Sequence, residues 1–370
     1  MQPGHMHPLR SALCGLCASL ALWSTWLIAC GSDGAADDGL SGAGSGASGG
    51  ASGSGDTGAT GPGGAGSSSS PASSSSGGPM GNPTLQAIPG NTALDLGAYL
   101  CDQPSDNPGG CAHITDYGKL VYDAPAHQLL MWGGGHAGNY ASNVMRFDLS
   151  ALAWGSEYDS TACANQVADN FDPITASWKD TQSPTARHTW DMMSIADVNG
   201  ARSLVILTSG GIGGYESCSA SPGEPVPAAG VTMSYGIEAK AWSFGTTAAD
   251  SLWYYASAQE TDPVSGQVLV LATWPSLELY DPDSGEVAHV AADFSAIDVN
   301  DLGYSNNLVY FPPNDRFYYL TRNAPVGVYE VAFDRDAMTA TLAEVATGDA
   351  PDNPNETGWA FDSTHQIIGG

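Results

Sequence analysis

The chain has 370 residues, of which 39 are acidic and 10 are basic, and its formal net charge at pH 7 is −29. Phosphate backbones and anionic lipid surfaces repel so acidic a chain, which excludes non-specific binding to nucleic acid or to a membrane surface. The negative charge could attract cations or basic partners, and it is also explained by solubility alone.

The first thirty residues have the layout of an export signal. Arg10 is the only Lys or Arg before an apolar, small-residue run that extends over 11–29. A short positive start, an apolar middle and small residues before the cut are typical of secretory signals. The run, at about 19 residues, is also long enough to span a membrane. A basic stop signal is missing, however, because Cys30 is followed directly by Gly, Ser and Asp.

Residues 27–30, Leu-Ile-Ala-Cys, resemble the lipobox of bacterial lipoproteins, in which the cysteine is lipidated and becomes the mature N-terminus. The resemblance implies a signal peptide over 1–29 and a lipidated Cys30. Gly31 stands where an inner-membrane retention signal would place Asp. The resemblance therefore implies an exported protein of the bacterial outer membrane or cell surface, attached to the membrane through its lipid only.

The segment after Cys30 predicts a tether. Residues 31–82 are mostly Gly, Ser and Ala and have almost nothing to bury. Such a composition cannot offset the entropy cost of ordering, so we expect 30–82 to be a disordered, flexible coil. A coil of about 50 residues spans roughly 40 Å on average, at about 5–6 Å × √n. The tether would hold a folded domain, residues 83–370, away from the membrane.

Four of the seven cysteines follow Cys30. An even number of cysteines in an exported domain predicts two disulfides. Cys101 and Cys111 bracket a Pro/Gly/Asn-rich loop, and we expect them to pair. Cys163 and Cys218 lie in two long insertions, at 159–186 and 212–230, which a second disulfide would join. A zinc site is disfavoured, because the mature chain has no Cys-x-x-Cys pair.

A strand–turn–strand pattern recurs along residues 83–370. It is clearest in LVYDAPAHQLLMWGGGH at 120–136 and WAFDSTHQIIGG at 359–370, with weaker copies at 256–273 and 305–321. Such a unit, repeated every few tens of residues, is typical of a β-propeller or solenoid. With almost no helical period, the pattern predicts an all-β domain built from four-stranded antiparallel blades.

The predicted strands group into four blades and the start of a fifth. They cover 117–123, 128–133, 142–148 and 152–158; 188–197, 203–211, 231–237 and 241–246; 252–259, 266–273, 277–281 and 286–291; and 305–311, 316–321, 327–334 and 340–346. The fifth blade begins at 358 and stops at Gly370. We therefore expect a propeller that is incomplete at its C-terminus, unless the segment 84–92 supplies an outer strand to the last blade.

Two stretches resemble kelch repeats. MWGGGHAGNYASNVMRFDLSALAW, at 131–154, has a glycine pair ending a strand, a loop, a strand with aromatic-Asp, and Trp six residues after that Asp. SPTARHTWDMM, at 183–193, resembles the Arg-His-Thr opening of the next kelch blade. The resemblance covers about 112–246 and weakens over 250–346, where the glycine pair is missing. It implies a kelch-type propeller, related to the galactose-oxidase-like ones.

Five residues are the predicted ligand contacts. Loops that leave inner strands line one mouth of a propeller's central channel, where His and Arg suit a carbohydrate, carboxylate or phosphate. The residues are His136, Asn139 and Tyr140 in the glycine loop of the first blade, and Arg187 and His188 at the start of the second. The same side chains could instead tie neighbouring blades together by bonding loop carbonyls, and this alternative stays open.

No catalytic, metal or cofactor motif emerges. A galactose-oxidase-like copper would need two Tyr, two His and a Tyr–Cys cross-link, but no mature histidine falls in a matching motif and the expected disulfides consume the cysteines. We therefore expect no metal and no cofactor. Trp178 and Trp274 lie in predicted loops, and we expect them to be exposed stacking platforms.

These features favour binding over catalysis. The predicted function is a surface-tethered binding module for carbohydrate, or another polar or protein ligand, at the channel mouth. The alternative is an extracellular enzyme acting on polysaccharide at the same face. A pair of acidic side chains or a set of metal ligands in the channel would favour the enzyme, whereas exposed aromatic side chains without such a set would favour binding.

Overall fold

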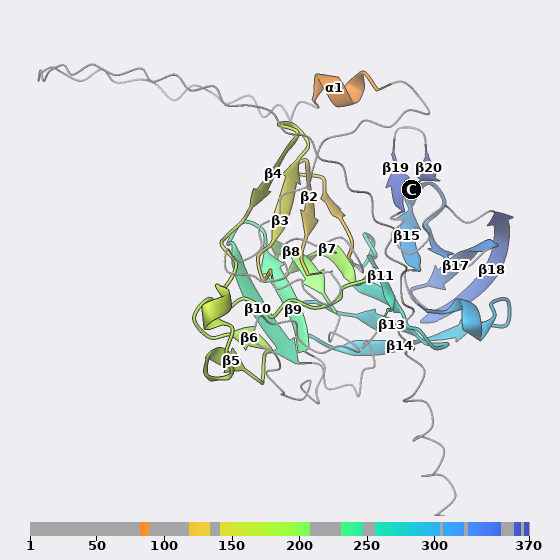
Figure 1. The fold of residues 1–370 in the computed structure, drawn as a ribbon. Helices are drawn as coiled ribbons and strands as arrows, with labels where there is room; N and C mark the ends of the chain where they lie inside the picture. Colours follow the sequence, from red (N-terminus) through yellow and green to blue (C-terminus); the bar gives the residue numbers. More distant parts are fainter. Residues whose placement is uncertain are drawn as a thin grey trace, which may run out of the picture. The chain divides into compact units, whose positions relative to one another are not determined.

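The computed structural model describes residues 82–88, 118–133, 141–207, 231–246, 256–303, 306–321, 325–348, 359–363 and 366–369. All of them lie in one compact unit, Ser73–Gly370. Apart from the short helix α1 (Pro83–Gln86) and 3-10 turns, the elements in these ranges are β-strands (Figure 1). No helix within these ranges is long and apolar enough to cross a membrane.

The strands form antiparallel meanders of four. The first sheet consists of β1 (Val121–Asp123), β2 (Gln128–Met131), β3 (Met145–Asp148) and β4 (Ala153–Ser156). The second consists of β7 (Met193–Val198), β8 (Ala201–Ile206), β9 (Val231–Gly236) and β10 (Ala241–Thr246). A hairpin of β5 (Phe171–Asp172) and β6 (Ser177–Trp178) lies in the insertion between them.

The third sheet consists of β11 (Ala258–Thr261), β12 (Val268–Leu271), β13 (Leu277–Tyr280) and β14 (Val287–Asp293). The fourth consists of β15 (Asn307–Phe311), β16 (Arg316–Leu320), β17 (Val326–Asp334) and β18 (Thr339–Gly348). Their outer strands β14 and β18 pair in parallel, which joins the two meanders. A last hairpin consists of β19 (Ala360–Asp362) and β20 (Ile367–Gly369).

The turns follow from their residues. Asp262, which directly follows β11, accepts hydrogen bonds from Val264 N and Ser265 Oγ, and Gly266 takes a φ of 78°. Asp281 repeats this arrangement after β13, where its Oδ1 accepts from the two amides that follow Pro282. Asp side chains that bond their own backbone two residues on, followed by a residue with positive φ, are the usual chemistry of tight hairpins.

The first strands of successive sheets gather at one place. β1 contacts β7, β7 contacts β11, β11 contacts β15, and β15 contacts β19. A parallel bridge between Asp191 and Ala258 lies at the second of these contacts. Four-stranded antiparallel sheets whose first strands meet in series are consistent with a β-propeller. The predicted all-β class and four-stranded sheets are therefore confirmed.

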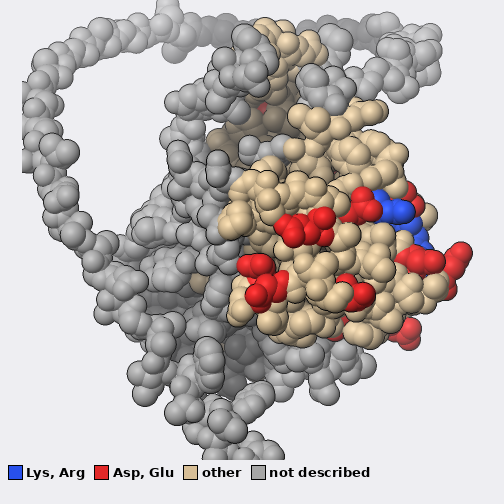
Figure 2. Space-filling view, turned by 90° about the vertical axis from the view of Figure 1, so that its right-hand side faces the viewer, with Lys and Arg blue, Asp and Glu red and all other residues tan. Residues whose placement is uncertain are grey.

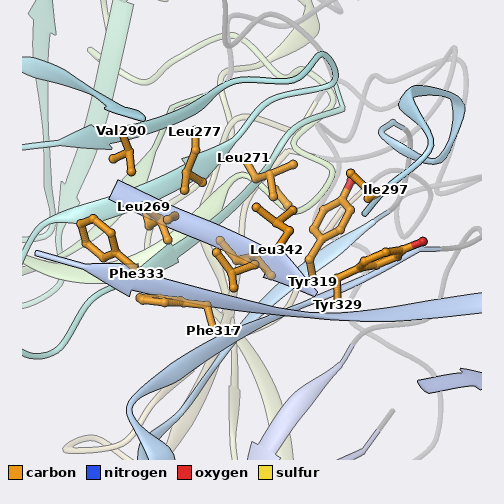
Figure 3. Close-up of a cluster of buried hydrophobic side chains, with 14 of the residues drawn as sticks. Leu269, Leu271, Leu277, Val290, Ile297, Phe317, Tyr319, Tyr329, Phe333 and Leu342 are labelled. Carbon is orange, nitrogen blue, oxygen red and sulfur yellow. The ribbon is translucent and has the colours of Figure 1, made fainter. Parts of the chain in front are cut away.

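Apolar side chains fill the space between neighbouring sheets. One cluster lies between the first and second sheets and includes Leu130, Trp132 and Leu204. Another joins the second sheet to the third. The largest lies between the third and fourth sheets, where Leu269 and Leu277 face residues such as Phe317, Tyr319 and Leu342 (Figure 3). Successive side chains of a strand point to opposite faces, and both faces of the second and third sheets are packed against a neighbouring sheet.

The surface around β17 and β18 carries part of the acidic excess. Asp334, Asp336 and Glu344 are exposed there. Figure 2 shows carboxylates scattered over the described surface on this side, with Lys and Arg confined to one spot. The carboxylates on this face are therefore solvated.

Three details of the sequence-based prediction are wrong. Residues 84–86 belong to α1 rather than to a strand, and the Asn82 side chain that caps this helix also donates to Ser150 O in the turn between β3 and β4. Residues 189–192 form a turn instead of the start of β7, because Met192 N bonds Thr189 O. Trp178 is 1% exposed, since it packs on Phe171 in the β5–β6 hairpin.

Candidate functional site

The five predicted ligand contacts are only partly described. His136, Asn139 and Tyr140 lie outside the described residues, as do Cys30, Cys101, Cys111 and Cys218. Cys163 is disulfide-bonded, and its pairing with Cys218 stays a prediction. Trp274, the second predicted stacking platform, is partly buried. The grouping of the five contacts into one site therefore stays a prediction too.

Arg187 faces inward. Its side chain is 1% exposed, and its guanidinium donates from Nε to Thr185 O at 3.2 Å and from Nη2 to Ala176 O at 3.0 Å. It also lies over the Trp132 ring, 5.8 Å from the centroid. His188 is partly buried, with its ring edge-on to Trp190 at 5.2 Å. Both carbonyl acceptors of Arg187 lie in the insertion between the first and second sheets.

A cluster of charged side chains that the sequence did not reveal lies where the first strands meet. It is called the central cluster here and consists of Lys119, Asp191 and Glu260. Lys119 precedes β1, Asp191 precedes β7, and Glu260 lies within β11. Lys119 Nζ is 2.7 Å from Asp191 Oδ1 and donates to Gln259 O at 3.3 Å. Three successive sheets thus contribute one charged side chain each.

Asp191 is held from both sides. While Oδ1 contacts Lys119, Oδ2 accepts a hydrogen bond from Leu308 N of β15 at 2.9 Å. The backbone carbonyl of Asp191 accepts from Gln259 N at 3.1 Å. The residue before it, Trp190, has a φ of 46°, a left-handed conformation that is unusual for a bulky side chain. Backbone strain of this kind tends to collect at functional sites.

Glu260 is less constrained than Asp191. Its Oε1 accepts from Thr261 N at 2.9 Å, and this is its only hydrogen bond from the residues that the structure describes. The Lys119 side chain is 12% exposed and that of Asp191 is 4% exposed, while Glu260 is partly buried. The central cluster is therefore shielded from solvent but not sealed, and Glu260 has a carboxylate oxygen to offer.

Burial changes the proton affinities in this cluster. Burial raises the pKa of Asp191 to about 7, although the Lys119 charge and hydrogen bond act in the opposite direction. Burial also raises the pKa of Glu260 against the attraction of Lys119. Burial alone would lower the pKa of Lys119, but the Asp191 and Glu260 carboxylates outweigh it and raise that pKa. A carboxyl group that titrates near neutral pH, as Asp191 does, is suited to acid–base chemistry.

Two unpaired hydrogen-bonding atoms belong to residues in and just before β11. Gln259 is fully buried, and its Nε2 donates to Ser194 Oγ and to Val205 O, both at 3.0 Å. Gln259 Oε1 and the hydroxyl of Ser257 are buried without a hydrogen-bond partner among the described residues. Such atoms are rare in folded proteins and call for an explanation, such as a bound water or ligand.

The described ranges contain no group of three or more His, Cys, Asp or Glu side chains placed to hold a metal ion. In the central cluster, the third charged member is the lysine, whose ammonium has no lone pair to offer to a cation. What this arrangement can do chemically is bind hydrogen-bonding groups and exchange protons.

No protein-family model matches the chain, and no curated protein matches it. Among solved structures, it resembles a GH43 glycoside hydrolase engineered to display both endo-xylanase and exo-arabinofuranosidase activity, with 10% identity and a TM-score of 0.39. The match covers 70% of this chain and 46% of that one. It also resembles a protein of unknown function from Bacteroides thetaiotaomicron, with 11% identity, a TM-score of 0.36, and coverage of 67% and 48%. This chain therefore spans just under half the length of each.

Proposed function

We propose that the protein is an exported binding module that holds a carbohydrate, or another polar ligand, at the central cluster of a kelch-type propeller. The observation that carries the proposal is the convergence of Lys119, Asp191 and Glu260 from three sheets. Replacing a buried ion pair with well-packed apolar residues is often neutral or stabilising, so stability alone gives little reason to keep one. A partly open cluster of this kind is better explained by a ligand.

The kelch assignment is supported by the end of β2. Gly133, in the glycine run of the kelch-like stretch, has a φ of 65°. A Cβ at this position would lie 2.6 Å from Arg187 O. Only glycine fits both the backbone conformation and the close approach of the Arg-His-Thr segment. This gives a physical reason for a glycine at the place where kelch repeats have one.

Export is supported by the signal-like N-terminus and by the disulfide at Cys163, since disulfides persist in oxidising compartments. If Cys30 is lipidated, the wild-type protein should sediment with membranes. Cys30→Ala should then release the protein or leave it as an unprocessed precursor. Recovery of all the wild-type protein in the soluble fraction would reject the lipid anchor.

The binding role is tested with a glycan array and isothermal titration of the best glycan. Glu260→Gln keeps the shape of the side chain and the acceptor for Thr261 N but removes the charge. Glu286→Gln, at an exposed turn residue, is the matched control. We expect Glu260→Gln to weaken binding at least tenfold and Glu286→Gln to leave it unchanged. Equal affinities for both variants would place the ligand elsewhere, and an array without any signal would reject the function.

A second function, hydrolysis of polysaccharide, is favoured by one observation: the central cluster holds two carboxyl groups whose pKa values are raised. Glycoside hydrolysis commonly uses two carboxyl groups: a general acid, whose raised pKa keeps it protonated to donate to the leaving oxygen, and an ionised carboxylate that assists attack at the anomeric carbon. The test is release of reducing sugar by wild type, Asp191→Asn and Glu260→Gln. Binding by the wild type without release of sugar would leave the binding role alone.

A further inference from the structure

We propose that the ligand group that enters the central cluster is a protonated amine, as carried by an amino sugar, and that acidic sugars are rejected. This inference rests on the proposed binding function of the same cluster. It follows from which groups in the cluster already have their hydrogen bonds filled by neighbours and which one keeps an oxygen for a ligand.

The positive charge of the cluster is already engaged. Lys119 Nζ lies 2.7 Å from Asp191 Oδ1 and also donates to Gln259 O. Asp191 is satisfied in turn, because its second oxygen accepts from Leu308 N. Glu260 accepts only from Thr261 N, the amide of its own neighbour, among the described residues. The group left to meet a ligand is therefore a carboxylate.

Among the described residues, further cations to receive an acidic ligand are not found beside the cluster. Every Lys and Arg side chain in the described part of the chain has a carboxylate or carbonyl partner. Arg187, the cation that the sequence offered for an anionic ligand, is 1% exposed and bonded to Thr185 O and Ala176 O. Arg202 and Arg335 are bonded to the buried carboxylates of Asp123 and Asp262, respectively.

A ligand that donates hydrogen bonds and carries positive charge suits the remaining carboxylate oxygen of Glu260. Hydrogen bonds from an ammonium to a carboxylate are roughly twice as strong as neutral ones.

The electrostatic potential of the whole protein also favours a cationic ligand. The formal net charge is −29, and carboxylates are scattered over the described face in Figure 2. A potential of this sign raises the local concentration of cationic ligands and lowers that of anionic ones. The potential that guides the approach of a ligand and the Glu260 carboxylate that contacts it therefore both select for positive charge.

The test compares three tetrasaccharides by isothermal titration with the full chain: β-1,4-linked glucosamine, its fully N-acetylated form, and α-1,4-linked galacturonic acid. We expect glucosamine tetramer to bind at least tenfold more tightly than the N-acetylated form, and the galacturonic acid tetramer not to bind. Glu260→Gln should abolish the preference for the amine. The matched control Glu286→Gln should retain it, because Glu286 lies in an exposed turn.

Each other outcome decides a different point. If the N-acetylated or the galacturonic acid tetramer binds wild type as tightly as the amine, the inference is overturned while the proposed function stands. A preference that survives in Glu260→Gln also overturns it, because the amine is then held elsewhere. If none of the three binds and the glycan array is empty, the proposed function fails and the inference fails with it. The wild-type comparison needs no variant, so a folding defect in Glu260→Gln cannot obscure the result.

Discussion

Arg335 offers a direct test of how the third and fourth sheets are held together. Its guanidinium makes a two-point contact with Asp262, Nε to Oδ2 and Nη2 to Oδ1, both at 2.7 Å. It also contacts Asp315 at 2.7 and 2.9 Å. The side chain of Asp262 is 0% exposed, that of Arg335 is 21% exposed, and that of Asp315 is 49% exposed. Arg335→Met would leave Asp262 buried without its counter-charge.

The expected cost follows from these exposures. Breaking a buried pair by removing one partner costs about 3–5 kcal/mol. Asp262 would still accept from Val264 N and Ser265 Oγ, and Arg335 is partly solvated, so the lower part of that range applies. The half-exposed contact with Asp315 adds about 0–1 kcal/mol. We therefore expect Arg335→Met to lower the free energy of unfolding by about 3–5 kcal/mol at pH 7.

The loss should depend on pH. Burial alone would raise the pKa of Asp262, but hydrogen bonds from Arg335 and the turn outweigh it, and the pKa is lowered. A carboxyl group whose folded pKa lies below its unfolded value stabilises the protein above the unfolded value, about 3.9. This stabilisation is lost as the pH falls through the folded pKa. The difference between wild type and Arg335→Met should therefore shrink in acid.

The assay is urea denaturation at pH 7 and pH 3. Arg316→Met is the matched control, because Arg316 is 38% exposed and its Nε lies 3.5 Å from Glu330 Oε1. An exposed pair of this kind contributes roughly 0–1 kcal/mol. Equal losses in Arg335→Met and Arg316→Met would refute the reasoning, as would a loss in Arg335→Met that does not change with pH.

Three further predictions test other parts of the structure. Gly133→Ala should lower the thermal midpoint more than Gly200→Ala. Both glycines have a positive φ, which costs an alanine about 1–3 kcal/mol. Only at Gly133 would the new Cβ also lie 2.6 Å from a backbone oxygen, that of Arg187. Equal midpoints would contradict this. The pKa of Asp191 in the folded protein is raised to about 7. Between about pH 4 and 7 its carboxyl group therefore holds a proton that the unfolded state releases, so stability should fall as the pH rises. Asp191→Asn should make this fall smaller. Midpoints at pH 5 and 7.5 measure this, and an unchanged slope would argue against it. Peptide mapping without reduction should find Cys163 bonded to Cys218, which closes a loop of about 55 residues and stabilises by about 4 kcal/mol. Any other partner for Cys163 would contradict the pairing.

Much of the fold can be read from the sequence because its signals are local. Alternating side chains fix strands such as β17, and Asp-Pro turns ending in glycine fix hairpins such as the one after Asp262. The helix α1 also had a readable start, with Asn82 as its N-cap and Pro83 in its first turn. The β-rich pattern of the rest of the chain obscured it.

The turn before β7 and the central cluster could not be read in the same way. Trp190 is a residue that favours strands, and nothing in its type announces a φ of 46°. Lys119, Asp191 and Glu260 are far apart in the sequence, and only the contacts between first strands bring them together. The one local signal of the central cluster was that a charged residue lies at or beside the apolar first strand of three successive blades.

The most direct test of the account is a crystal structure of the protein with the glycan that gives the strongest array signal. The account predicts that the glycan lies among the first strands of the sheets, with a donor group within hydrogen-bonding distance of the Glu260 carboxylate. A glycan bound on another face of the protein, with no contact to Glu260, Asp191 or Lys119, would contradict it.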